Sequence, residues 1–160
     1  MNNNDRVILL IDIFVLSISK PILVGVYKNN KLIDSYTNSN STSDSLPYIF
    51  DIILEKYHDI DNLYFVNSPG SYMSIKISYI FLNTFSIIND IPLYATSGFY
   101  FNYRTPIKAI GKKFFIYNNG DLVIDFLENN NELRNFYLPS ILDSKIFTKN
   151  ILPTYDLSCV

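Results

Sequence analysis

Apolar residues in the first hundred positions fall into short continuous runs and two longer periodic stretches. Continuous runs without alternation are typical of strands that are buried on both faces of a sheet. The turn Lys28-Asn29-Asn30-Lys31 predicts a hairpin, because asparagine tolerates the positive φ of a two-residue turn. The runs predict five strands, at residues 6–18, 22–27, 31–37, 63–66 and 91–95.

The two periodic stretches predict helices. The first helix is expected to begin near Ser43 or Asp44, with Pro47 in its first turn, where proline removes no backbone hydrogen bond. The second is expected from Ser71 to Asn89, after the turn at 67–70. The core-facing stripe of the first helix comprises Leu46, Ile49, Phe50, Ile53, Leu54 and Tyr57.

The element order is therefore β-β-β-α-β-α-β. An antiparallel meander followed by parallel crossovers predicts an α/β fold with a mixed sheet. This is the order of the first lobe of an actin-like or ribonuclease-H-like fold. After residue 97 the pattern becomes short and irregular, apart from a hairpin around Asn118-Asn119-Gly120. We expect an actin-like lobe at 1–97 and a reduced second lobe at 98–160.

The second helix is apolar on two opposite sides, and a sheet can cover only one of them. One stripe comprises Ile77, Ile80, Phe81, Thr84, Phe85 and Ile88, and the other comprises Tyr72, Ile75, Tyr79, Leu82 and Ser86. We expect a partner subunit to cover the second side. The alternative is that the C-terminal segment of the same chain covers it, but that segment is short. Expected partner contacts are Tyr48 and Ile52 on the first helix and Tyr72, Ile75, Tyr79 and Leu82 on the second. Ser74 and Ser78 are small enough to let a neighbouring helix approach closely.

Composition limits the chemistry of this 160-residue chain. One histidine, one cysteine and no tryptophan exclude a disulfide framework and a two-histidine metal site, and favour a cytoplasmic location. Thirteen basic against fifteen acidic residues do not favour binding of nucleic acid by charge alone. The apolar run at 7–18 contains Asp12 and is too short to span a membrane.

Asp12 is the candidate for nucleotide chemistry. In actin-like ATP-binding proteins a carboxylate at the end of the first strand serves the metal of bound ATP. Here bulky residues at 13–16 follow it instead of glycines, so a phosphate could not approach the backbone closely. The turn Ser68–Ser71 could cradle an anion, but a turn in which Ser71 caps the helix is the simpler interpretation. We therefore expect no cofactor, and keep a nucleotide-dependent enzyme that uses Asp12 as an alternative.

The segment Asn67–Ser78, which reads NSPGSYMSIKIS, resembles the G-R-G-P-G-S-F-T-G-[VL]-R-I-G run of the TsaB (YeaZ) family. The segments Ile91–Ser97 and Ile8–Asp12 resemble that family's strands on either side, and Leu152–Tyr155 resembles its C-terminal P-x-Y. The resemblance covers about residues 6–97. Asn67-Ser68 replaces the family's Arg-Gly, Ser74 and Ser78 replace glycines, and the second lobe is shorter.

The resemblance implies a non-catalytic subunit. TsaB is the partner of TsaD in forming threonylcarbamoyladenosine next to the anticodon of tRNA, and uses its two helices to meet the equivalent pair of TsaD. The ATPase TsaE and threonylcarbamoyl-AMP are further associates of the family, and tRNA would be met only through the complex. A homodimeric structural protein that uses the same helix face is the remaining alternative.

Overall fold

The computed structural model describes residues 9–129 and 133–154, and its larger sheet has five strands. In space their order is β3-β2-β1-β4-β5. β2 is antiparallel to β1 and β3, whereas β1, β4 and β5 are parallel. The strands are β1 (Ile11–Leu16), β2 (Ile22–Lys28), β3 (Lys31–Asn38), β4 (Asn62–Ser68) and β5 (Leu93–Ser97).

The predicted element order and the mixed sheet are confirmed. Asn29 and Asn30 both have positive φ in the β2–β3 turn, as the sequence predicts. β5 begins two residues later than expected, because Pro92 lies before the strand and its carbonyl accepts a hydrogen bond from the amide of Leu63. The part of the first predicted strand at 6–8 lies outside the described residues.

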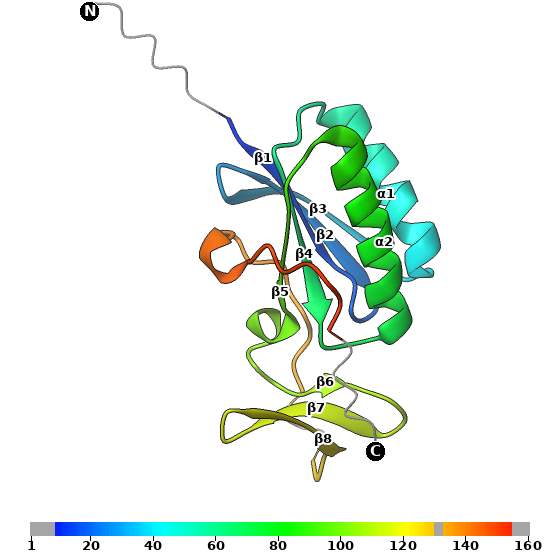
Figure 1. Cartoon of the computed structure of the whole chain (residues 1–160), viewed down its shortest axis with the longest axis vertical. Coiled ribbons are helices and arrows are strands. Elements are labelled where there is room, and N and C mark those ends of the chain that lie inside the picture. Colours follow the sequence, from blue (N-terminus) through cyan, green and yellow to red (C-terminus); the bar gives the residue numbers. More distant parts are fainter. Residues whose placement is uncertain (1–8, 130–132, 155–160) are drawn as a thin grey trace, which may run out of the picture.

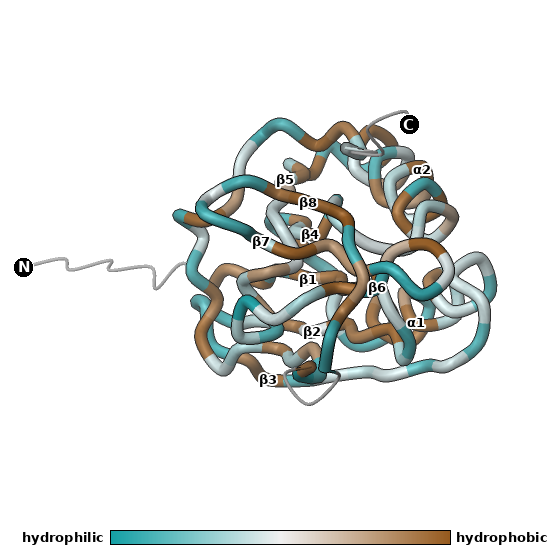
Figure 2. Tube along the Cα trace, turned by 90° about the horizontal axis from the view of Figure 1, so that it is seen from below, coloured by the Kyte–Doolittle hydropathy of each residue, from teal (hydrophilic) through white to brown (hydrophobic). Residues whose placement is uncertain are grey.

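Two helices cover one face of this sheet (Figures 1 and 2). α1 (Thr42–Lys56) begins earlier than predicted, because the hydroxyl of Ser41 accepts a hydrogen bond from the amide of Asp44 and caps the helix. Pro47 consequently lies in the second turn, which corrects its expected place in the first. α2 (Tyr72–Asn89) is followed by the C-cap residue Asp90, whose φ of 54° is left-handed.

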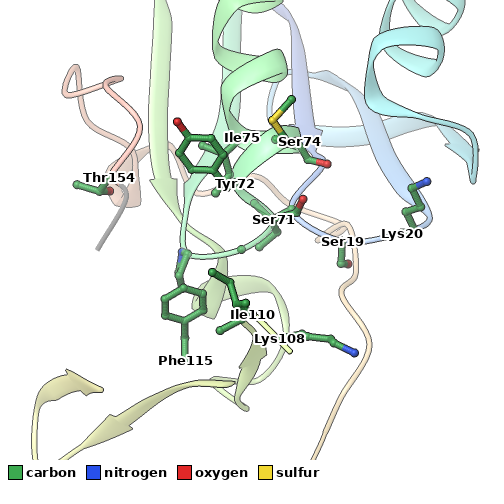
Figure 3. Close-up of a pocket in the computed structure, with 15 residues that line it drawn as sticks. Ser19, Lys20, Ser71, Tyr72, Ser74, Ile75, Lys108, Ile110, Phe115 and Thr154 are labelled. Carbon is green, nitrogen blue, oxygen red and sulfur yellow. The ribbon is translucent and has the colours of Figure 1, made fainter. Parts of the chain in front are cut away.

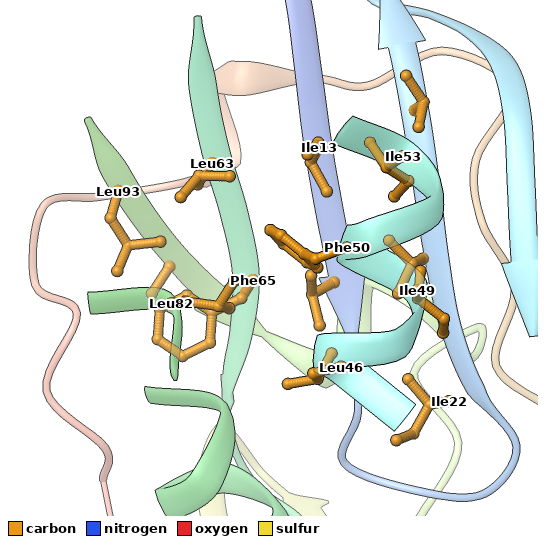
Figure 4. Close-up of a cluster of buried hydrophobic side chains, with 14 residues drawn as sticks. Ile13, Ile22, Leu46, Ile49, Phe50, Ile53, Leu63, Phe65, Leu82 and Leu93 are labelled. Carbon is orange, nitrogen blue, oxygen red and sulfur yellow. The ribbon is translucent and has the colours of Figure 1, made fainter. Parts of the chain in front are cut away.

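Phe50 joins the two helices to the sheet. Its ring contacts those of Phe81 and Phe85 edge-on, at centroid distances of 5.0 and 5.2 Å. On the sheet side, Ile13 of β1 and Phe65 of β4 belong to the same buried cluster (Figure 4). The predicted α1 stripe is largely confirmed, with Leu46, Ile49, Phe50 and Ile53 buried and Leu54 and Tyr57 half-buried.

The opposite face of the sheet is covered by parts of the chain within residues 98–129 and 133–148. Strands alternate their side chains between faces, so Phe14 and Leu16 of β1 enter a second buried cluster there. That cluster includes Phe99 and Phe101 of the short helix η1 (Gly98–Phe101), and Phe147 after η3 (Ser144–Ile146). A smaller sheet lies beyond the C-terminal end of β4 and joins this cluster through Ile107 and Phe115 (Figure 1). Its strands are β6 (Ile107–Lys108), β7 (Lys113–Asn118) and β8 (Asp121–Phe126).

The C-terminal segment is held against the sheet by polar contacts as well. The hydroxyl of Tyr27 donates to the carbonyl of Pro139 at 2.8 Å, and that of Thr96 donates to the carbonyl of Ile146 at 2.7 Å. Ala95 forms a bridge with Thr148. Residues 139–148 therefore cover the sheet face opposite the helices, and Ile151 packs against the helix-side core. The two-domain division at residue 97 stays a prediction.

We expect Phe50→Ala to lower the free energy of unfolding by about 3–5 kcal/mol, because it removes a buried ring and leaves a cavity. Phe50→Leu should lose less, since most of the volume remains filled. Urea unfolding of both variants measures the difference. Equal losses would contradict an aromatic contact that holds α1 to α2.

Candidate functional site

Two serines bring α2 close to its neighbours within the chain. The hydroxyl of Thr42, at the start of α1, donates to that of Ser74 at 2.9 Å. The hydroxyls of Ser78 and Ser17, which follows β1, are hydrogen-bonded in the buried interior. Ser74 thus lies against α1 of the same chain, and Ser78 lies against the sheet. Both contacts fix the rotation of α2 about its axis.

That rotation decides which apolar stripe of α2 is covered. Ile75 and Leu82 are buried beneath the helix, with exposed fractions of 1% and 0%. The sequence-based assignment of these two residues to a partner surface is therefore wrong, because their side chains are already enclosed by the chain's own core. Both stripes are apolar, so hydrophobic periodicity alone could not rank them.

The opposite stripe lines a groove between α1 and α2, with a volume of about 410 Å³. Ile80 and Ile88 are 54% and 75% exposed, although they are large aliphatic side chains. None of the groove's lining residues is charged. They are Thr42, Ser43, Leu46 and Pro47 of α1 and Ile77, Ile80, Phe81, Thr84, Phe85 and Ile88 of α2.

The other predicted contact residues are accessible but lie outside this groove. Tyr48 and Tyr72 are exposed, and Ile52 and Tyr79 are half-buried. On α2, Tyr79 is turned by about 100° from its neighbour Ile80, which lines the groove. The structure thus does not bring the six predicted residues together into one surface. The sequence does indicate the groove, but through the other apolar stripe of the same helix, which contains Ile80 and Ile88.

Asp12 does not form a nucleotide site. It is the second residue of β1, not its end, so it lies about 13 Å along the strand from the carboxyl end of the parallel strands, where α2 begins. The amide of Asn62 donates to its carboxylate at 2.8 Å. Burial raises the pKa of Asp12 above its ordinary value, although the hydrogen bond from Asn62 opposes the shift. Among the described residues, no cluster of three His, Cys, Asp or Glu could hold a metal.

The turn before α2 is a structural junction. Gly70 is required by close approach, since a Cβ there would lie 2.5 Å from the Cβ of Ile18. Ser71 precedes the helix, but its side chain makes no capping hydrogen bond, which corrects the expected cap. Asn67 has a structural role at this turn that its local sequence does not indicate. Its buried amide donates to the carbonyls of Asn150 and Leu152, at 3.2 and 3.0 Å, and ties the C-terminal segment to this turn.

Solved structures share this fold. YeaZ from Pseudomonas aeruginosa matches with a TM-score of 0.55 and 12% identity, over 72% of this chain and 64% of that chain. A structure described as an uncharacterized protein with similarity to peptidase YEAZ from Pseudomonas aeruginosa matches with a TM-score of 0.57 and 12% identity, over 72% of this chain and 63% of that chain. No family model and no curated protein matches the chain.

The expected actin-like or ribonuclease-H-like fold is confirmed by this likeness. The chain spans just under two thirds of the length of both structures. In the described part of the chain, neither α1 nor α2 combines the length and hydropathy needed to cross a membrane.

We expect Asp12→Asn to stabilise the protein at neutral pH. The folded state raises the pKa of Asp12, so it holds this proton more tightly than the unfolded state, and stability falls as the pH rises through the folded pKa. An asparagine at position 12 keeps a side-chain oxygen that can accept the hydrogen bond from Asn62. Because it cannot ionise, the loss of stability with rising pH is removed. The gain in Tm should be present at pH 7 and vanish below about pH 4, the range of an unperturbed Asp. A gain that is independent of pH would contradict the argument.

Proposed function

We propose that this chain is a non-catalytic subunit that binds a TsaD-type partner for threonylcarbamoylation of tRNA. The observation that carries the proposal is the uncharged groove between α1 and α2, with Ile80 and Ile88 exposed on it. Large exposed apolar patches on a folded chain mark interaction surfaces. The likeness to YeaZ structures and the resemblance of the 67–78 segment to TsaB support the identity of the partner.

The chemistry of the groove favours an apolar helix as its occupant. Aliphatic and aromatic side chains recur at helical spacing along α2, as in helix-in-groove recognition. With no charge on its walls, the groove offers nothing to pair with a charged ligand. A partner helix would remove Ile80 and Ile88 from water. In this role the chain orders its partner and contributes no reacting group.

We expect Ile88→Glu to weaken binding to TsaD from the same cell by more than about a hundredfold, because it places an unpaired carboxylate in an apolar interface. Ile87→Glu is the matched control. Ile87 is 72% exposed on the same helix but does not line the groove, so its variant should bind within about threefold of the original. Isothermal titration calorimetry gives both affinities, and circular dichroism checks the fold.

Tyr79→Glu distinguishes the two faces of α2. Tyr79 lies outside the groove, so this variant should keep its affinity for TsaD. Loss of binding in Tyr79→Glu but not in Ile88→Glu would restore the face expected from the sequence. Light scattering after size exclusion tests the alternative. A stable homodimer with no TsaD complex, lost on Ile88→Glu, would favour a homodimeric structural protein.

A further inference from the structure

A second cavity lies between the β1–β2 connection of the larger sheet and the smaller sheet. Its volume is about 560 Å³, within the range of small-molecule sites. Three separate parts of the chain form its walls: the β1–β2 connection, residues 106–108 with Phe114, and residues 133–136. It shares Ile18, Ser19, Lys20 and Lys108 with an adjoining cavity beside the first turn of α2 (Figure 3).

Each of these three parts contributes a cation to the cavity. They are Lys20, Lys108 and Arg134, and no carboxylate lines the cavity among the described residues. Figure 3 shows Ser19 between Lys20 and Lys108 at the edge that the two cavities share. Within the described residues the only ion pair joins Lys56 to Asp34, so none of the three cations is neutralised there. Like charges gathered around one cavity repel one another unless an anion enters.

The sequence around the cavity has the same charge bias. Residues 98–120 contain four cationic side chains and no carboxylate, in a chain whose net charge is −2. The cationic character is therefore local. It belongs to the segment that forms η1, β6 and β7, and not to the surface as a whole.

Backbone hydrogen bonds hold the cationic segments in place. The amide of Arg134 donates to the hydroxyl of Thr105 at 3.2 Å, and that hydroxyl donates to the carbonyl of Asn102 at 2.9 Å. The amide of Ala109 donates to the carbonyl of Lys113 at 2.9 Å, which fixes the strand next to Lys108. The cations thus extend from anchored backbone, which reduces the entropy lost when a ligand binds.

Apart from Ser19 and Asn135, the rest of the lining is apolar. Phe114 and Phe136 are half-buried there, beside Leu23 and Pro106. A bare oxyanion would fill only a fraction of the cavity and would leave these walls uncovered. A phosphate monoester carries close to two negative charges at neutral pH, and arginine binds it with paired hydrogen bonds. We propose that this cavity binds a small organic phosphate, with its phosphate at Lys20, Lys108 and Arg134 and an aromatic body against Phe114 and Phe136.

Phenyl phosphate, inorganic phosphate and phenol are the probes, titrated calorimetrically into the isolated full chain. Phenyl phosphate should bind tightest, because it engages both the cations and the aromatic wall. Lys108→Gln and Arg134→Gln should each weaken it about tenfold, the loss expected for one charged hydrogen bond. Lys112→Gln is the matched control, since Lys112 lies in the same cationic segment but lines neither cavity, and its affinity should be unchanged.

Three results would overturn the proposal: no binding of phenyl phosphate, equal affinity in Lys108→Gln and the original chain, or an equal loss in Lys112→Gln. Inorganic phosphate that binds as tightly as phenyl phosphate would overturn the aromatic part. The measurement needs no TsaD, and the substitutions lie outside the helix groove. Failure here and failure of the proposed subunit role are therefore separate outcomes.

Discussion

The rotation of α2 about its own axis determines which of its two apolar sides is buried against the sheet and which is exposed to solvent. The helix is apolar on two sides, and either side could in principle lie on the sheet. The short side chain of Ser78 lets α2 lie close to the end of β1, where its hydroxyl meets that of Ser17. Ser74 meets Thr42 at the start of α1. A hydroxyl buried without a partner costs free energy, so turning the helix would break both pairs. The rotation that satisfies them buries Ile75 and Leu82 and leaves Ile80 and Ile88 outside.

Sequence patterns predicted the elements of this fold well and its surfaces poorly. Continuous apolar runs identified the strands, and the asparagine turn at 29–30 was correct to the residue, because both depend on local chemistry. The covered side of α2 depends instead on Ser17, which lies 61 positions from Ser78. Asp12 was misplaced for a related reason. The apolar run at 6–18 does not tell where the paired part of β1 begins, and this is set by its partners in β2 and β4.

The part of the candidate site that depends on local sequence could be predicted, and the part that depends on contacts between distant residues could not. The sequence correctly indicated that one stripe of α2 lacks cover within the sheet. It did not indicate where the C-terminal segment goes, because residues 136–154 have no periodicity. The segment is held by hydrogen bonds from the side chains of Tyr27, Thr96 and Asn67. Each of these bonds joins residues at least 50 positions apart in the chain. These contacts place residues 139–148 on the face of the sheet opposite the helices, whereas Ile151 packs against the helix-side core and Thr154 lines the cavity beside the first turn of α2.

The two candidate sites differ in their chemistry in a way that assigns them different roles. The helix groove has no charged wall, and exclusion of water from Ile80 and Ile88 is the main driving force available to its occupant. The cavity beside the smaller sheet is lined by three cations, so the anionic ligand that we propose for it should bind less tightly as the salt concentration rises. They are connected through one element. The first turn of α2 borders the adjoining cavity at Tyr72 and Ser74, and Ile77 of the next turn borders the groove. A ligand that shifts the start of α2 would therefore also move the surface that a partner contacts.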